Sequence, residues 1–255
     1  MAYEFIKTSR DEGIVRIIFN RPKHNMLNIP MMKELCTEFD ALSKDAELKG
    51  IVLSGEGPSF CAGVDVGDHK PDVVEEMIEV FNRMFITIHD LEVPLIAAVH
   101  GACLGGGMEV AIACDIILAT RSAIFGQPEI KLAFFPPYAA IRLPRLVGVA
   151  KAMEICLTGK RYSAEEACRL GLVSHVVDED KFNEALDALL GEIKTSSPLI
   201  IRLNKRAIKE NLDRDFLTAL RNVGDLFLHT LMKTEDTQEG IRSYFEKRKP
   251  QWKNR

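Results

Sequence analysis

Short runs of β-branched residues alternate with longer runs of helical periodicity along the first half of the chain. Five runs are predicted to be strands, at residues 14–19, 51–54, 95–99, 116–119 and 123–126. Asn28 and Pro30 are typical of a helix start and predict an amphipathic helix to about Ser43. Apolar residues spaced three and four apart predict a second helix over residues 73–89. Strands that alternate with helices in this way indicate an α/β fold.

The sequence becomes mainly helical in character after about residue 145. Ser163 and Glu166 match the capping-box pattern, and Ser197 followed by proline predicts a further helix start. A chain of 255 residues with 47% hydrophobic residues fits one large domain, or a core with a small appendage. We predict a core over residues 1–195 and a helical region over residues 196–255. No internal repeat is evident in the sequence.

Composition and charge argue against several classes of protein. The net charge of −4, from 33 basic and 37 acidic residues, predicts no broad positive surface for nucleic acid. The apolar stretch at residues 94–119 is interrupted by His100, Glu109 and Asp115, and residues 1–10 do not resemble a signal peptide, so neither a membrane span nor secretion is expected. The six cysteines form no Cys-x-x-Cys pair, which favours reduced thiols in the cytoplasm.

Three adjacent glycines, Gly105 to Gly107, connect a predicted strand to a short helix near residues 108–113 that carries Glu109. Such a turn brings strand and helix close together, or leaves bare amides open to a ligand. On the glycines alone, the tight turn is the commoner explanation. No Lys-Ser or Lys-Thr follows as in a P-loop, no dinucleotide-binding pattern is completed, and no Gly-x-Ser-x-Gly elbow is present.

Two further segments have similar features. Residues 59–65 place Gly63 after a predicted strand, where open α/β sheets bind ligands. In residues 125–129, Pro128 fixes the backbone directly before Glu129. Taken singly, the first is an ordinary turn and the second a solvated surface charge.

Together, the three segments resemble the crotonase (enoyl-CoA hydratase/isomerase) family in order and spacing over nearly the whole chain. Five other segments also resemble the family, at residues 20–22 (Asn-Arg-Pro), 113–116, 157–159, 167–173 and 246–249. The resemblance implies a spiral of ββα repeats and a C-terminal helical region that mediates trimerisation. It also implies a homotrimer or a hexamer made of two trimers.

The resemblance implies a role for each catalytic segment. Backbone amides of Val64 and Gly106 would form an oxyanion hole for the thioester carbonyl of an acyl-CoA. Glu109 would activate a water molecule, and Glu129 would deliver a proton to the α-carbon. Because both glutamates are present, hydration of an enoyl-CoA is favoured over isomerisation. Coenzyme A is part of the substrate, and no other cofactor and no metal are expected, since the histidines are scattered.

The same resemblance predicts contacts to the substrate around this centre. Lys23 and Lys247 would meet the phosphates of coenzyme A, and the carbonyl of Ala62 would meet the adenine. Tyr244 would reach the ligand, often from a neighbouring subunit. Asp65, at the end of the second glycine segment, is also predicted to bind substrate. His100 is predicted to be a structural residue at a strand end.

The chain departs from the family after Glu129. Many fatty-acyl hydratases continue with a glycine-rich stretch, whereas residues 132–142 contain Phe134, Phe135 and Tyr138 around two prolines. These rings either contact the acyl group or pack in the core or at a subunit interface. The pattern resembles the branch that hydrates cyclohexa-1,5-diene-1-carboxyl-CoA, which is one alternative function. Enoyl-CoA isomerisation and an RNA-binding or scaffold role are further alternatives, and the acidic balance and the glutamate pair argue against the last.

Overall fold

The computed structural model describes residues 3–255 and contains two β-sheets. The larger sheet has six strands in the order β1-β2-β3-β5-β7-β10. Its strands are β1 (Ile6–Asp11), β2 (Ile14–Phe19), β3 (Gly50–Gly55), β5 (Leu95–Val99), β7 (Ile116–Thr120) and β10 (His175–Val177). β1 pairs antiparallel with β2, and all other neighbours are parallel. Every residue of β5 is buried, as expected for a central parallel strand covered on both faces.

The smaller sheet lies beside the larger one and has the order β4-β6-β8-β9. Its strands are β4 (Ser59–Cys61), β6 (Ala102–Leu104), β8 (Ile124–Gly126) and β9 (Arg161–Ser163). The chain places one strand in each sheet and then forms a helix, first as β3, β4 and α2 (Val74–Asp90), and next as β5, β6 and α3 (Gly106–Ala113). This alternation is the predicted spiral of ββα units.

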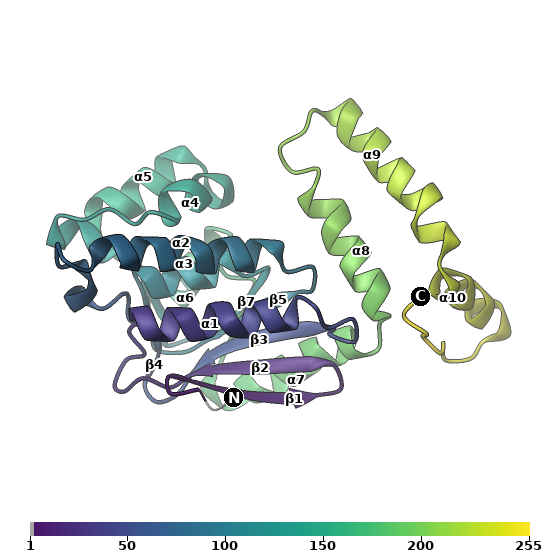
Figure 1. The fold of residues 1–255 in the computed structure, drawn as a ribbon, viewed down its shortest axis with the longest axis horizontal. Coiled ribbons are helices and arrows are strands. Elements are labelled where there is room, and N and C mark those ends of the chain that lie inside the picture. The colour runs from purple at the N-terminus through teal and green to yellow at the C-terminus, as the bar shows by residue number, and fades with distance from the viewer. Residues whose placement is uncertain (1–2) are drawn as a thin grey trace.

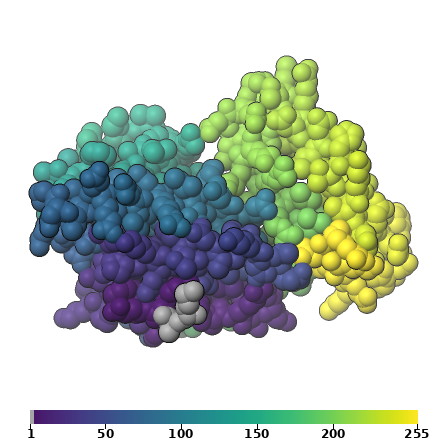
Figure 2. All heavy atoms as spheres, in the orientation of Figure 1, coloured from purple at the N-terminus to yellow at the C-terminus, as the bar shows by residue number. Residues whose placement is uncertain are grey.

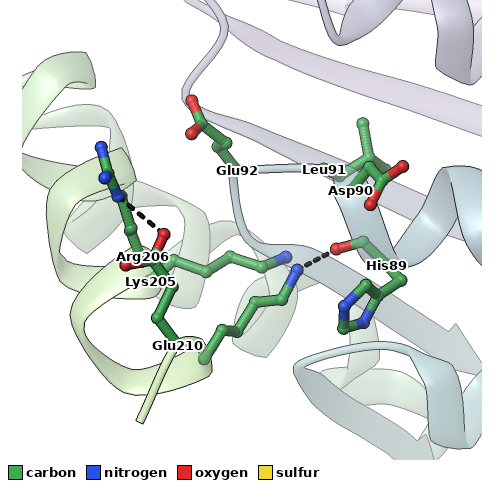
Figure 3. Close-up of a pocket in the computed structure, with 8 residues that line it drawn as sticks. His89, Asp90, Leu91, Glu92, Lys205, Arg206 and Glu210 are labelled. Atoms are coloured by element: carbon green, nitrogen blue, oxygen red, sulfur yellow. Dashed lines mark hydrogen bonds and ion pairs between the residues drawn. The ribbon is translucent and has the colours of Figure 1, made fainter.

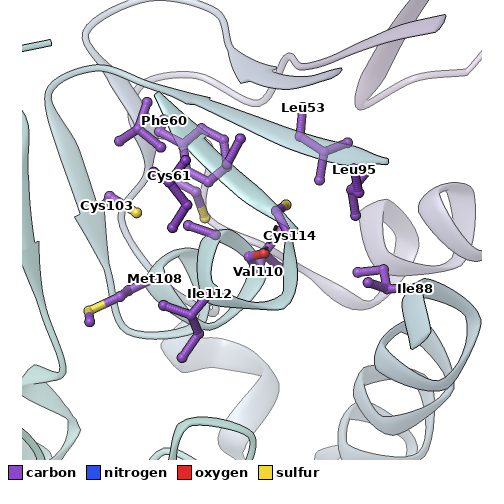
Figure 4. Packing of buried hydrophobic residues seen from close by; sticks show 14 of the residues in the cluster. Leu53, Phe60, Cys61, Ile88, Leu95, Cys103, Met108, Val110, Ile112 and Cys114 are labelled. Carbon is purple, nitrogen blue, oxygen red and sulfur yellow. Dashed lines mark hydrogen bonds between the residues drawn. The ribbon is translucent and has the colours of Figure 1, made fainter. Parts of the chain in front are cut away.

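Helices cover both faces of the larger sheet (Figure 1). On one face, α1 (Ile29–Leu42) and α2 pack on the side chains of the main core, which include Val15, Ile17 and Leu53. On the other face, Leu186 and Leu190 of α7 (Phe182–Lys194) pack on alternate residues of the same strands. The side chains of α3 lie inside the main core (Figure 4), and residues 106–112 are all buried. A helix that is apolar on all sides requires such a position.

Other helices connect the strands and surround the end of α3. They are η1 (Val66–His69), η2 (Pro128–Leu132), α4 (Ala139–Val147), α5 (Val149–Thr158), α6 (Ala164–Arg169) and η3 (Glu179–Lys181). Two predicted helix starts are confirmed by their caps. The side chain of Asn28 accepts a hydrogen bond from the amide of Met31 at 3.0 Å, and Ser163 and Glu166 form a complete capping box.

The chain after residue 197 forms a helical lobe that stands beside the core (Figure 2). It contains α8 (Pro198–Lys209), α9 (Phe216–His229), η4 (Leu231–Lys233) and α10 (Glu235–Glu246). The buried carboxylate of Asp236 accepts hydrogen bonds from the hydroxyl of Ser197 and from the amides of Lys253 and Asn254. Asp236 and residues 252–255 form what we call the C-terminal latch. Through Asn254, the latch also donates to the carbonyl of Ala46 in the core at 2.8 Å.

All six cysteines are free thiols, as predicted from their spacing. Among residues 3–255, no helix has the length and the apolar content needed to cross a membrane.

Candidate active site

Glu109 lies in the first turn of α3 and is only 2% exposed. Its Oε1 accepts hydrogen bonds from the amide of Tyr138 at 2.7 Å and from the amide of Ala139 at 2.8 Å, both at the start of α4. Burial raises the pKa of Glu109 to about 8, against the amide of Ala139, which lowers it, and the nearby charge of Glu129 raises the pKa further. Glu109 can therefore exchange a proton near neutral pH.

Glu129 is partly buried in η2, directly after Pro128, and is not the solvated surface charge that its local sequence suggests. Burial raises the pKa of Glu129 to about 7. The side chain of Gln127 is fully buried, and in the orientation that satisfies its hydrogen bonds its nitrogen lies 3.0 Å and 3.1 Å from the two carboxylate oxygens of Glu129. The side-chain amide group of Gln127 thus fixes the orientation of the Glu129 carboxylate.

Gly105 brings the start of α3 against Glu129. Its φ of 52° lies in the left-handed region that favours glycine, and its amide donates to the carbonyl of Gly126 at 2.9 Å. A Cβ atom at this position would lie 2.6 Å from Oε1 of Glu129, well inside contact distance. The glycine run therefore allows the close approach of a carboxylate.

The amides of Val64 and Gly106 lie side by side. A Cβ atom built on Gly106 would be 3.4 Å from the nitrogen of Val64. Leu27 forms a parallel β-bridge with Val64: its amide donates to the carbonyl of Gly63, and its carbonyl accepts from the amide of Asp65. The bridge therefore does not use the N–H of Val64. Gly106 begins α3, where amides have no carbonyl partner within the helix. Both neighbouring N–H groups are therefore available to a ligand.

The loop that carries Val64 is fixed by the pair Arg21 and Asp65. Arg21 donates to Oδ2 of Asp65 at 2.6 Å and to the carbonyl of Met26 at 2.9 Å. Oδ1 of Asp65 accepts from the amide of Gly67 at 2.9 Å, and this amide, followed by the guanidinium of Arg21, lowers the pKa of Asp65. Both oxygens of the predicted substrate ligand Asp65 are thus engaged in holding its own loop.

Lys23 and Ala62 are brought together next to Val64. The amide of Ala62 donates to the carbonyl of His24 at 2.9 Å, which joins the segment after Arg21 to the second glycine segment. Lys23 is exposed and Ala62 is partly exposed. His100, predicted to be structural, has Nε2 at 2.8 Å from the carbonyl of Gly57.

The three aromatic residues after Glu129 occupy different environments. The ring of Phe134 lies 4.7 Å from the ring of His69 in η1, and Phe135 is 73% exposed. Tyr138 stacks on Phe85 of α2, with ring centroids 3.9 Å apart and ring planes 9° apart. The prediction treated these residues as one group, but the structure separates them.

Tyr244 and Lys247 do not join the glutamates within one chain. Both are exposed at the end of α10, which belongs to the helical lobe and lies on the far side of α8 from α3 and α4 (Figure 1). Tyr244 is 79% exposed.

Gln127 has no predicted role, although it lies in the Phe-Gly-Gln-Pro-Glu segment. The amides that hold Glu109 were not predicted either, because backbone donors from a segment 29 residues away leave no local pattern. Within residues 3–255, no group of three or more His, Cys, Asp and Glu side chains is arranged to hold a metal ion.

A surface pocket of about 240 Å³ lies between the end of α2 and α8 (Figure 3). Its lysines are engaged by the core. Lys205 donates to the carboxylate of Asp115 at 2.6 Å and to the carbonyl of Val93 at 2.7 Å, and Lys209 donates to the carbonyl of His89. Cations at the carbonyl end of a helix are stabilising, so we interpret this pocket as the junction between the core and α8.

Comparisons with known proteins agree with this geometry. The family model described as enoyl-CoA hydratase/isomerase matches residues 9–255. A short-chain-enoyl-CoA hydratase of Clostridium acetobutylicum is 36% identical over 96% of both chains. A cyclohexa-1,5-dienecarbonyl-CoA hydratase of Thauera aromatica is 33% identical over 96% of this chain and 95% of its own. The crystal structure of an enoyl-CoA hydratase from Bacillus anthracis has a TM-score of 0.94 and 32% identity, covering 99% of this chain and 100% of that one. The chain belongs to the enoyl-CoA hydratase/isomerase family.

Proposed function

We propose that this enzyme hydrates an enoyl-CoA, adding water across the 2,3 double bond of the acyl thioester. The observation that carries the proposal is the pair of buried glutamates, Glu109 and Glu129, beside the adjacent amides of Val64 and Gly106. The amides would hold the thioester oxygen, on which negative charge develops as water adds. One such donor is typically worth about 3 kcal/mol of transition-state stabilisation.

The glutamates would carry out the proton transfers. Ionised Glu109 takes a proton from water as the hydroxyl bonds to the β-carbon, and the electron pair of the double bond passes to the thioester oxygen. Protonated Glu129 then gives its proton to the α-carbon as the enolate collapses. The pKa values of Glu109 and Glu129, about 8 and about 7, place the proton of the pair mainly on Glu109 near neutral pH. The reactive form, with Glu109 ionised and Glu129 protonated, is therefore the minor one, and reaching it costs about 1.4 kcal/mol for one unit of pKa difference.

Substitution of each glutamate by glutamine tests the mechanism. Glu109→Gln and Glu129→Gln should each lower the kcat of crotonyl-CoA hydration by about 10²- to 10⁴-fold, since each removes a positioned acid-base group. Hydration is followed by the loss of absorbance of the conjugated thioester. Glu184→Gln, at an exposed position on α7, is the matched control and should behave like the unmodified enzyme. Near-normal turnover by either catalytic variant would refute the assignment.

The ends of coenzyme A would be held by the loops around Val64 and by a second chain. Lys23 and the carbonyl of Ala62 would meet the phosphates and the adenine of the same chain's ligand. Tyr244 and Lys247 would serve the site of a neighbouring subunit, which fits their exposure and their distance from α3.

A homotrimer, or a hexamer made of two trimers, would bring these residues into place, with residues 196–255 as the trimerisation region. Large apolar side chains of α9 support this assembly, because Phe216, Leu220 and Phe227 are 75%, 58% and 51% exposed. On the core, Ile141, Met153 and Leu157 of α4 and α5 are also more than half exposed. Apolar patches of this kind are typical of protein interfaces.

Hydration of a cyclic dienoyl-CoA is a second candidate function. It is favoured by the Thauera aromatica relative and by the ring of Phe134 after Glu129, stiffened by two following prolines. Comparison of kcat/KM for crotonyl-CoA and cyclohexa-1,5-diene-1-carboxyl-CoA distinguishes the two. Fast hydration of crotonyl-CoA without activity on the diene eliminates the cyclic substrate.

A further inference from the structure

The start of α4 holds Glu109 from outside its own helix. The first backbone amides of a helix have no carbonyl partner within that helix. In α4, the side chain of the N-cap residue Tyr138 accepts no hydrogen bond from them. The carboxylate of Glu109 takes that role, because it accepts from the amides of Tyr138 and Ala139 at 2.7 Å and 2.8 Å. Any shift of this helix start would therefore move the anchor of Glu109.

The ring of Tyr138 connects the start of α4 to the main core. It lies flat on Phe85 of α2, with centroids 3.9 Å apart and planes 9° apart. Phe85 is 6% exposed, and its ring packs edge-on with the ring of Phe81, one turn earlier in α2, with ring centroids 4.7 Å apart. The stack therefore rests on a ring that the core holds in place. Further along α4, Arg142 adds a bond to the carbonyl of Ile112 in α3 at 3.1 Å.

We propose that Phe85 is a positioning residue for catalysis, which through its stack on Tyr138 fixes the two amides that orient Glu109. The inference rests on the proposed function, since it concerns the water-activating carboxylate. Phe85 belongs to α2 and acts entirely through Tyr138. The stack takes its second ring from the segment in which the chain departs from the glycine-rich pattern of many fatty-acyl hydratases.

Two pairs of variants and a control test the stack. Phe85→Leu and Tyr138→Leu remove one ring each, whereas Phe85→Tyr and Tyr138→Phe keep both rings. Phe39→Leu is the matched control, because Phe39 of α1 is also buried in the main core but belongs to neither the pair of Phe81 with Phe85 nor the stack of Phe85 on Tyr138. We expect kcat to fall about tenfold in the two ring-removing variants with KM changed less than about twofold, since misplacement of a catalytic group mainly affects turnover. The ring-keeping variants and Phe39→Leu should retain normal kcat.

A second measurement does not depend on turnover. The titration of Glu109 can be followed by NMR of carboxyl-¹³C-labelled glutamate, with Glu109→Gln to identify its signal. Loss of the two amide donors disfavours the ionised form, so the pKa of Glu109 should rise further in Phe85→Leu and stay unchanged in Phe39→Leu. If the unmodified enzyme hydrates no enoyl-CoA, the proposed function fails, while this titration still tests the stack.

Two outcomes would overturn the inference. Equal losses of kcat in Phe85→Leu and Phe39→Leu, with an unchanged Glu109 titration, would mean that the stack contributes only to core packing. A Tyr138→Leu variant with altered KM values across acyl groups, together with a normal Phe85→Leu enzyme, would mean that Tyr138 contacts the acyl group directly.

Discussion

The burial of the Glu109 carboxylate makes the stability of the folded enzyme depend on pH. The pKa of Glu109 is raised from 4.5 to about 8 by burial in the folded chain, so the folded state holds a proton that the unfolded chain releases above about pH 4.5. The contribution of Glu109 to stability is therefore fully present below the unfolded pKa and is lost as pH rises through about 8.

The Glu109→Gln variant lacks this titration. Its free energy of unfolding, measured with urea, should fall less between about pH 5 and about pH 9 than that of the unmodified enzyme. Glu184→Gln again serves as the control, since Glu184 is exposed. Parallel pH dependence in all three proteins would show that Glu109 is not strained in its ionised form.

At Gly105, a single methyl group should disable the site. Gly105→Ala would place a Cβ 2.6 Å from Oε1 of Glu129 on a backbone with φ of 52°, so Glu129 must move. We expect kcat to fall by about 10²-fold, as for a misplaced catalytic group. Gly191→Ala is the control, because nothing lies within 4 Å of the new Cβ in α7. Equal kinetics in the two variants would contradict the placement of Glu129.

At this scale, the sequence predicts the catalytic pair only through family resemblance. Glu129 alone has the local pattern of a surface charge, and its partial burial depends on Gln127 and on the glycine run, which no short window reveals. The positions of Phe134, Phe135 and Tyr138 could not be distinguished from sequence either, because the partners His69 and Phe85 come from other elements.

Among the elements, those with strong local signals are the ones predicted from sequence. The cap at Asn28, the strand at residues 14–19 and the helix over residues 73–89 agree with the structure to within one residue. Strands β4 and β6 were missed because they have three residues each, too few to show a period. Since β4 and β6 are the strands that complete the first two ββα units, the repeat of the spiral is invisible in the sequence.

The cap of α1 gives a prediction at the scale of one helix. Asn28→Ala removes the acceptor for the amide of Met31 and should lower the free energy of unfolding by about 1 kcal/mol. Asn28→Asp keeps an acceptor and should cost much less. Neither change should alter kcat, and urea unfolding together with the hydratase assay checks both statements. A cap variant with normal stability would mean that packing alone holds this helix.

For the whole molecule, the exposed apolar face of α9 should make the proposed trimer sensitive to one added charge. Leu220→Glu places a carboxylate on this face and should reduce the population of trimers in light scattering coupled to gel filtration. His229→Glu puts the same group on the side of α9 that carries Asp225, and it should leave the oligomer intact. A monomeric unmodified protein would contradict the proposed assembly, as would a trimer that is indifferent to Leu220→Glu.

The C-terminal latch limits how this protein can be handled in the laboratory. The carbonyl of Arg255 accepts a hydrogen bond from the amide of Asp236 at 3.1 Å. The buried carboxylate of Asp236 accepts hydrogen bonds from the amides of Lys253 and Asn254. An affinity tag or fluorescent fusion joined directly to Arg255 would therefore disturb the hydrogen bonds of Asp236, the residue that connects α10 to Ser197 at the start of α8. Labels for microscopy or capture are better attached at an exposed side chain, such as a cysteine introduced in place of Glu184.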